Sequence, residues 1–306
     1  DKIMTITAGV DEVGRGPLAG PVVAAAVILP KDHTIDGLKD SKKLSKLKRE
    51  FLFPLIHEQA IGVGVGEVDV KTIDKINIRE ATFKAMQIAL NGLSTVPEKA
   101  LIDGHPLNNQ VIPNEGIIGG DDKVDSIKAA SIIAKVTRDR IMKEYAIIFP
   151  EYDFENNSGY GTKKHMDALK HYRATPIHRR SFKPVKELMP TFKWLESNGR
   201  IGWIGKKLAA LYIKNKGLDV IKLDFINESS GHIDIIAKKG NQFIFIDVNT
   251  SYLDNNSISE KRDNDLKSAI DVYCKENSLG SNFRIDTISV ILRSNKPEIL
   301  HNKGLR

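Results

Sequence analysis

The sequence has a single cysteine, Cys274, among its 306 residues. One cysteine cannot form an intramolecular disulfide, which excludes the class of small disulfide-bonded secreted domains and favours a reducing compartment. Long hydrophobic runs are also missing, because the most apolar stretch, residues 22–29, has the length of a strand and not of a membrane span. No charged and then apolar leader is evident either. We therefore expect a cytoplasmic protein with no membrane contact.

Composition limits the number of domains and the size of the core but does not identify the function. Hydrophobic residues make up 41% of the chain, which is ample for a packed core, and the length allows one large domain or two ordinary ones. The formal net charge of +7 is compatible with a polyanionic partner, but proteins with no such partner often show a similar excess. The motifs must decide between these readings.

The first part of the chain alternates between strand and helix patterns. This alternation predicts an α/β domain with a mixed, centrally buried sheet and flanking helices. A stretch with prolines and turn residues at 184–199 marks a boundary, so we predict one domain over residues 1–190 and a second over 197–306. Strands are predicted at residues 5–10, 22–29, 60–68 and 100–102, and helices at residues 41–59, 78–90 and 124–148.

The second part restarts with a helix and has the order α-β-β-β-α-β, which makes a complete small α/β domain. A turn at Lys239, Gly240 and Asn241 predicts a hairpin between two of its strands. The predicted helices cover residues 203–216 and 259–277, and the predicted strands cover residues 220–226, 233–237, 243–248 and 287–292.

Acidic residues follow several predicted strands of the first domain. Asp11 and Glu12 come after the first strand, Asp103 ends the strand at residues 100–102, and Asp121 precedes the longest helix. Acids at the carboxyl ends of neighbouring strands can converge at one sheet edge, where their oxygens suit Mg²⁺ or Mn²⁺. Two such ions support phosphodiester hydrolysis by clamping the attacking and leaving oxygens.

The same acids also have an ordinary structural reading. An Asp-Gly pair after a strand is usually a turn, and Asp122 and Asp125 near Asp121 are typical of helix N-termini, where the helix dipole favours negative charge. Spacing alone leaves the metal site and the structural reading open.

A series of motifs over about residues 4–186 resembles bacterial ribonuclease HII. The motifs occur in the order found in that family, and together they are very specific. They are Val10-Asp11-Glu12-Val13-Gly14-Arg15-Gly16-Pro17-Leu18-Ala19-Gly20-Pro21-Val22, Leu38-Lys39-Asp40-Ser41-Lys42-Lys43-Leu44, Ile102-Asp103-Gly104, Gly120-Asp121, Ala129-Ala130-Ser131-Ile132-Ile133-Ala134-Lys135-Val136-Thr137-Arg138-Asp139, Gly159-Tyr160-Gly161-Thr162 with His165, and His178-Arg179 with Ser181-Phe182.

The resemblance implies a ribonuclease H-like fold and an endoribonuclease of type 2. Its metal-binding and catalytic carboxylates would be Asp11, Glu12, Asp103 and Asp121, with Mn²⁺ or Mg²⁺ as the cofactor. Its substrates would be RNA–DNA hybrids and duplex DNA that contains ribonucleotides. Cleavage would occur on the 5′ side of a ribonucleotide by attack of water on phosphorus, which leaves a 3′-hydroxyl and a 5′-phosphate.

The resemblance also implies residues that bind the substrate. Gly14, Arg15 and Gly16 would recognise the 2′-hydroxyl at the RNA–DNA junction, which is physically sensible because glycines allow the backbone to approach a sugar closely. Tyr160 would pack against the junction sugar, although a core aromatic is its ordinary reading.

Other basic and hydroxyl side chains in the motifs have a weaker link to the substrate. Ser131 and Lys135 would help with phosphate contacts or packing. Ser158 stands where the family often has Lys, which would weaken a phosphate contact. A basic group would either contact duplex phosphates or form a solvated helix face; it comprises Lys42, Lys43, Lys46, Lys48 and Arg49.

Residues 200–292 resemble the YraN-like group of bacterial proteins, which has a restriction-endonuclease-like core. The motifs are Gly202 to Ala209, Gly231-His232-Ile233-Asp234-Ile235-Ile236-Ala237 and Phe243-Ile244-Phe245-Ile246-Asp247-Val248-Asn249-Thr250.

Nucleases of this kind hold Mg²⁺ with an acid on the second strand and an acid-x-Lys on the third. Asp234 and Asp247 keep the two acids here, but Asn249 replaces the lysine and His232 stands where the group usually has Glu. Because Asn cannot supply an ammonium, we expect a degenerate core that binds nucleic acid or a partner. Two alternatives remain: a hybrid-binding protein with no activity, and a bifunctional protein whose second domain is a metal-dependent DNA nuclease.

Overall fold

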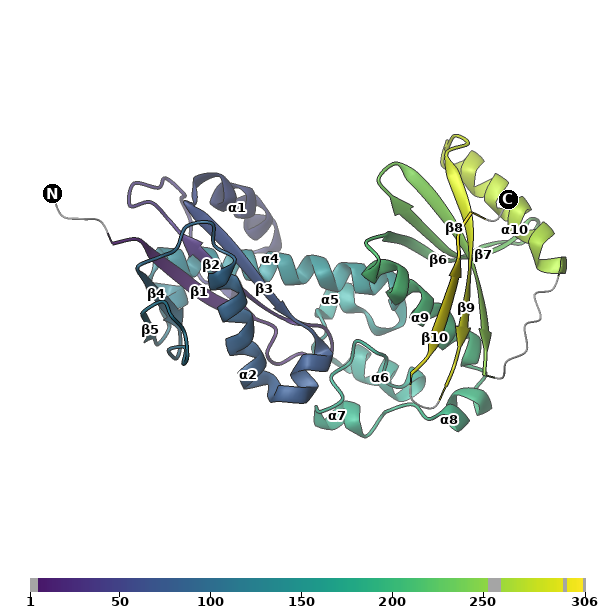
Figure 1. Ribbon diagram of the computed structural model, residues 1–306, viewed down its shortest axis with the longest axis horizontal. Helices are drawn as coiled ribbons and strands as arrows, with labels where there is room; N and C mark the ends of the chain where they lie inside the picture. The colour runs from purple at the N-terminus through teal and green to yellow at the C-terminus, as the bar shows by residue number, and fades with distance from the viewer. Residues whose placement is uncertain (1–4, 253–259, 294–295, 305–306) are drawn as a thin grey trace. The chain divides into compact units, whose positions relative to one another are not determined.

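The computed structural model describes residues 5–252, 260–293 and 296–304, and the chain divides into two compact units. One unit contains residues 1–143 and 152–189, and the other contains residues 144–151 and 190–306. Each unit has its own five-stranded sheet with helices packed against it (Figure 1). The predicted α/β class is confirmed for both parts of the chain.

The sheet of the first unit is mixed and has β1 (Thr7–Val13) at its centre. β1 pairs antiparallel with β2 (Val22–Ile28) and parallel with β4 (Lys99–Asp103). β3 (Gly62–Val68) forms one edge beside β2, and β5 (Asn114–Ile117) forms the other edge beside β4. This order brings the carboxyl ends of β1 and β4 next to each other.

Helices cover both faces of this sheet (Figure 1). Even-numbered residues of β2 belong to a core cluster with α2 (Val70–Asn91), and odd-numbered residues belong to a cluster with α1 (Lys46–Gln59) and α4 (Asp125–Ile148). Side chains alternate between the faces of a strand, so burial on both sides explains why β2 is apolar throughout. The remaining helical elements up to Lys186 are η1 (Ser41–Lys43), α3 (Gly120–Lys123), η2 (Pro150–Tyr152), α5 (Phe154–Asn157), α6 (Lys163–Tyr172) and α7 (Lys183–Lys186).

Two predictions about elements of the first domain were wrong in detail, and one strand was missed. Residues 41–59 are not one helix, because Leu44 is extended and the side chain of Ser45 caps a new helix by accepting from the Lys48 amide. α2 begins eight residues before the predicted start, with a kink at Asn77 whose side chain caps the second half by accepting from the Glu80 amide. The strand β5 was missed because its four residues are too short to show a period.

The second unit has a mixed sheet in the order β10-β9-β8-β7-β6. The hairpin at Gly240 is confirmed, with both flanking strands antiparallel, whereas β8 and β9 are parallel. A fifth strand beyond the predicted ones pairs antiparallel with β9. Ser259, the predicted first residue of a helix, lies outside the described residues. The elements are α8 (Phe192–Ser197), α9 (Ile201–Asn215), β6 (Asp219–Asn227), β7 (Gly231–Lys239), β8 (Gln242–Ser251), α10 (Glu260–Glu276), β9 (Phe283–Ile291) and β10 (Glu298–Asn302).

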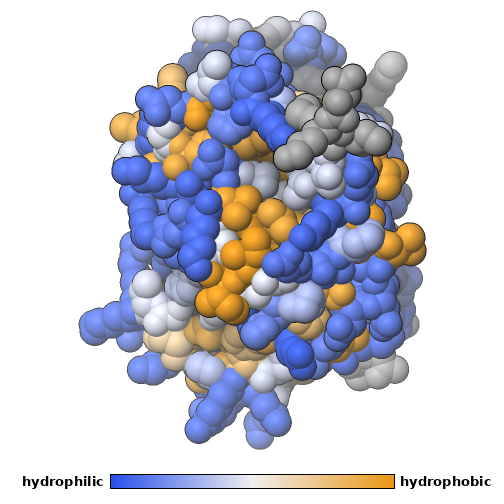
Figure 2. Space-filling model, turned by 90° about the vertical axis from the view of Figure 1, so that its left-hand side faces the viewer, coloured by the Kyte–Doolittle hydropathy of each residue, from blue (hydrophilic) through white to orange (hydrophobic). Residues whose placement is uncertain are grey.

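The surface of the chain is largely polar on the face drawn in Figure 2, where a limited band of apolar atoms lies between hydrophilic side chains. Among the residues that the structure describes, none of the helices combines the length and the apolarity needed to cross a bilayer.

Candidate active site

Three carboxylates of the first unit converge at the carboxyl ends of β1 and β4. The register pairs Val10 with Ile102, so the following residues, Asp11 and Asp103, are neighbours. Asp121 reaches the same place from α3, and one oxygen of each of the three acids lies within 4.8 Å of the others. Asp11 lies within β1 and Asp103 ends β4, whereas the sequence placed Asp11 after its strand.

Backbone amides fix the orientation of these acids. Asp103 Oδ1 accepts from the Gly120 amide at 2.8 Å and from the Asp121 amide at 3.3 Å, which ties the end of β4 to the start of α3. Asp11 Oδ1 accepts from the Glu12 amide at 2.7 Å. The positions of these oxygens therefore depend on the main chain and not on exposed side chains.

Negative charge is concentrated here without enough positive charge to balance it. Asp11 is only 5% exposed, and burial, together with the charges of Glu12 and Asp103, raises its pKa well above the usual range. Burial also raises the pKa of Glu12 and of Asp121, and repulsion by Asp103 acts in the same direction on both. A hard divalent cation stabilises buried carboxylates whose like charges are held close together, so these residues fit Mn²⁺ or Mg²⁺.

Ser131 and Lys42 lie close to this cluster. A hydrogen bond from Ser131 to Asp11 opposes the rise in the pKa of Asp11, and the hydroxyl oxygens of Ser131 and Ser41 are 2.7 Å apart. Burial alone would lower the pKa of Lys42, but the charges of Asp40, Asp11 and the other site acids outweigh it and raise that pKa. Lys42, which the sequence grouped with phosphate contacts, thus lies in the field of the carboxylates.

A turn beside the carboxylates carries Gly14, Arg15 and Gly16. Arg15 Nη1 lies 3.6 Å from Glu12 Oε1, and the Arg15 side chain is 57% exposed. Gly14 has φ +92°, and a Cβ there would lie 2.2 Å from Nε of Arg138, so both the backbone and the space require glycine. The ring of Tyr160 lies beside Gly16, since a Cβ on Gly16 would be 3.4 Å from its Cε1.

Two fully buried arginines lie against this turn, and one of them, Arg179, bonds to its carbonyls. Arg179 donates to the carbonyls of Gly14 at 2.5 Å and Arg15 at 2.8 Å, and Arg138 donates to the carbonyls of Pro21, Ala19 and Ser158. Burial lowers the pKa of Arg138 to about 10 and that of Arg179 to about 9, so both remain charged at neutral pH. The sequence reasoning assigned neither a role, and their only sequence signal was a charged residue within an otherwise buried motif.

A pair of histidines supports the Tyr160 segment. His165 Nδ1 lies 2.8 Å from the Tyr160 carbonyl oxygen, and the Nε2 atoms of His165 and His178 are 3.0 Å apart. The Thr175 amide donates to His178 Nδ1 at 3.0 Å, which leaves Nε2 of His178 as the donor to His165. Burial lowers the pKa of both rings, that of His178 furthest, so the pair is neutral and each nitrogen has a defined role.

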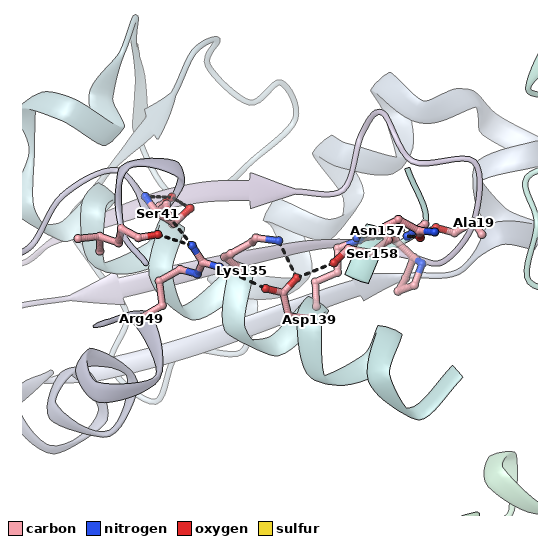
Figure 3. Close-up of polar contacts among 12 residues, drawn as sticks. Ala19, Ser41, Arg49, Lys135, Asp139, Asn157 and Ser158 are labelled. Atoms are coloured by element: carbon pink, nitrogen blue, oxygen red, sulfur yellow. Dashed lines mark hydrogen bonds and ion pairs between the residues drawn. The ribbon is translucent and has the colours of Figure 1, made fainter. Parts of the chain in front are cut away.

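Figure 3 shows a second polar network, which links the segment around Ser41 to the segment at Asn157 and Ser158. Lys135 Nζ donates to Asp139 Oδ1 at 2.6 Å, and the Ser158 hydroxyl donates to the same oxygen at 3.1 Å. Arg49 donates to the Ser41 carbonyl at 2.9 Å and lies 3.7 Å from the other oxygen of Asp139. The network therefore places Lys135 beside Asp139.

A cleft of about 570 Å³ opens next to the carboxylates. Glu12, Arg15 and Asp103 line one part of it, and Arg79 and Phe83 of α2 line another. The guanidinium of Arg79 lies over the Phe83 ring at 5.4 Å. The cleft thus joins the acidic cluster to a cation on an aromatic surface, a combination suited to a nucleic acid strand.

The second unit brings Asp234 and His232, which the sequence singled out, together with Asp224, which it did not. Asp234 forms a potential metal cluster with Asp224 and His232, whose ligand atoms lie within 4.8 Å of one another. Asp247 lines the same cavity of about 390 Å³ but is not a member of that cluster. Asp224 was missed because it lies within a strand pattern, where its φ of +53° and the register shift between Val220 and Lys222 cannot be foreseen.

Known proteins resemble both parts of the chain. Residues 8–185 match the family model of ribonuclease HII, and residues 205–290 match the uncharacterised protein family UPF0102, which corresponds to the YraN-like group. The ribonuclease HII of Enterococcus faecalis is 55% identical over 184 residues, which cover 60% of this chain and 72% of the relative. That of Listeria innocua is 55% identical over 189 residues, covering 62% of this chain and 72% of the relative.

A solved structure gives the same result for the fold. The ribonuclease H2 of Pyrococcus horikoshii matches with a TM-score of 0.51 and 29% identity, over 60% of this chain and 96% of that one. The family match extends over more than half of the chain and contains the carboxylate cluster, the arginine-supported turn and the cleft. The chain therefore belongs to the ribonuclease HII family, whose members are divalent-metal-dependent hydrolases of the RNA strand in RNA–DNA hybrids.

Proposed function

We propose that Asp11, Glu12, Asp103 and Asp121 hold Mn²⁺ or Mg²⁺ and that the enzyme cuts on the 5′ side of a ribonucleotide in a hybrid or in duplex DNA. The observation that carries this proposal is the convergence of three buried or half-buried acids at one sheet edge. Their negative charges are close together, and the pKa values of Asp11 and Asp121 are raised. When bound, the metal ions would activate water and stabilise charge on the phosphate, leaving a 3′-hydroxyl and a 5′-phosphate.

The main chain of residues 14–16 is the proposed recognition surface for the 2′-hydroxyl. All described peptide bonds are trans, and in a trans peptide the carbonyl and the following amide point in opposite directions. Because Arg179 holds the carbonyls of Gly14 and Arg15, the amides of Arg15 and Gly16 are directed away from that guanidinium. Tyr160, which is 46% exposed beside Gly16, would pack on the same sugar.

Lys42, Arg15 and Ser131 have supporting roles in this proposal. Arg15 and Lys42 would offset part of the negative charge that a phosphate adds to the acidic cluster. Ser131 would orient Asp11 through its hydroxyl. Lys135 would act on phosphate only through a rearrangement, because its ammonium is engaged by Asp139.

The test uses a DNA duplex with one embedded ribonucleotide, incubated with the full chain and Mn²⁺ or Mg²⁺, beside an all-DNA duplex and a long RNA–DNA hybrid. We expect a single cut 5′ of the ribonucleotide, lost in Asp11→Asn. If folded protein with metal cuts neither RNA-containing substrate, the chain only binds hybrids. Cleavage of the all-DNA control that disappears in Asp234→Asn would instead support a second, DNA-cutting site.

A further inference from the structure

The cavity of the second unit contains a positively charged side chain, Lys206. Lys206, on α9, places its ammonium between two acids: it forms an ion pair with Asp224 and lies 2.9 Å from Asp234 Oδ1. The Lys206 side chain is only 16% exposed, so this contact is inside the cavity and not on a solvated helix face.

Other contacts also engage the ligand atoms of this cluster. Asp234 Oδ2 accepts from the Val248 amide at 2.8 Å. His232 Nε2 lies 3.1 Å from Asp224 Oδ1, and its Nδ1 lies 3.6 Å from Asp234 Oδ1. The ammonium and the imidazole therefore contact the very oxygens that would have to bind a metal ion.

The close fit of α9 on the sheet keeps Lys206 in place. Gly205 precedes it, and a Cβ on Gly205 would lie 1.9 Å from Thr250 Oγ1, so the helix backbone approaches β8 at that point. Burial disfavours the charge of Lys206, but Asp234 and Asp224 outweigh this effect and raise its pKa. Lys206 is thus a fixed, permanently charged group at neutral pH.

We propose that the ammonium of Lys206 occupies the cation position of this nuclease-like cavity, so that the second unit holds no divalent metal there and a single substitution of Lys206 would create a metal site. The donor set of Asp224, His232 and Asp234 suits a divalent cation. A metal ion and the ammonium of Lys206 cannot both occupy it, because the two positive charges would repel each other strongly. Asp247 and Asp265 also line the cavity and add negative charge that would help to retain a metal once Lys206 is neutral.

The test measures Mn²⁺ binding by the full chain in an Asp11→Asn, Asp103→Asn background, which removes the first site and makes the result independent of the proposed catalytic function. In this background we expect no Mn²⁺ binding that depends on Asp234. Adding Lys206→Gln should create one Mn²⁺ site, at least about tenfold tighter than residual binding, and Asp234→Asn should remove it again. Lys239→Gln, on the exposed end of β7, is the matched control and should create no site.

Either of two results would overturn the proposal: an Asp234-dependent Mn²⁺ site in the background chain, or a folded Lys206→Gln variant that gains none. If the Lys206→Gln variant does not fold, labelling of Lys206 in the background chain decides the question. Acetylation of Lys206, measured by mass spectrometry, should be slow and unchanged by Mn²⁺. Faster labelling when Mn²⁺ is added would show that the metal displaces the ammonium and would refute the proposal.

Discussion

The two units contain acidic clusters of similar composition whose electrostatics are opposite. In the first unit, burial and repulsion raise the pKa of Asp11 well above its usual range. In the second unit, hydrogen bonds from His232 and Lys206 overcome burial and lower the pKa of Asp224 to about 2. Among the residues that the structure describes, no lysine or arginine forms an ion pair with Asp11, Asp103 or Asp121, whereas Lys206 contacts both Asp224 and Asp234.

This difference shows why a count of acids does not identify a metal site. A cluster binds a cation when the protein leaves its charge uncompensated, and it becomes an ordinary ion-pair network when a lysine enters it. The relevant observation is therefore the balance of charge around the acids.

Removing one charge from the first cluster should have the largest effect. Asp103→Asn keeps an oxygen that can accept from the Gly120 and Asp121 amides but loses the carboxylate charge. We expect cleavage of the embedded-ribonucleotide duplex to fall by more than about 100-fold, since even loss of a group that only orients a metal ligand costs about 10- to 100-fold. Asp234→Asn, the counterpart in the second unit, should keep the rate within about twofold. Equal losses in both variants would contradict the comparison.

Metal should stabilise the chain through the first cluster alone. Mn²⁺ at 100 times its dissociation constant should add about 2.7 kcal/mol to the free energy of unfolding. The gain should vanish in the Asp11→Asn, Asp103→Asn variant and persist in Asp234→Asn. Thermal unfolding with and without Mn²⁺ measures both, and a gain that depends on Asp234 would place a metal in the second unit.

Acid should weaken metal binding at the first cluster at a higher pH than ordinary carboxylates would allow. Protons compete with the metal for Asp11, Glu12 and Asp121, whose pKa values are raised, so affinity is greatest above those values and falls as the pH decreases through them. The expected slope is up to about tenfold per pH unit for each proton displaced. Calorimetric titration with Mn²⁺ over a pH series tests this, and affinity that does not change down to the usual aspartate pKa would refute the raised values.

Lys42 should have the smallest effect because it acts on the acids through its field. Its charge lowers the pKa of both Glu12 and Asp121. In Lys42→Ala these pKa values should rise, which moves the acid limb of the pH–rate profile to higher pH and lowers the rate at neutral pH by about threefold. Lys46→Ala, at the exposed start of α1, is the control and should leave the profile unchanged. A lowered rate with an unshifted profile would mean that Lys42 contacts the substrate instead.

The convergence of Asp11, Asp103 and Asp121 could be expected from the sequence because acids near the ends of neighbouring strands meet at one sheet edge, while their role as metal ligands came from the family resemblance. β1 and β4 are adjacent and parallel, so the acids near their carboxyl ends, Asp11 and Asp103, lie side by side. The supporting arginines could not be predicted in the same way, because Arg179 donates to a carbonyl 165 positions away. Lys206 and Asp224 were missed for a related reason: a lysine on a helix usually faces solvent, and only the tertiary packing of α9 places this one in a cavity.

The reach of Arg179 has a consequence for how the enzyme is made. The elements that carry Asp11, Asp103 and Asp121 are all synthesised by the end of α4, whereas the turn at Gly14 receives its supporting guanidinium only after Arg179 has been added. At ordinary rates of translation the turn waits on the order of 10 s for that residue. The proposed recognition turn therefore gains its supporting side chain later in synthesis than the elements that form the acidic cluster.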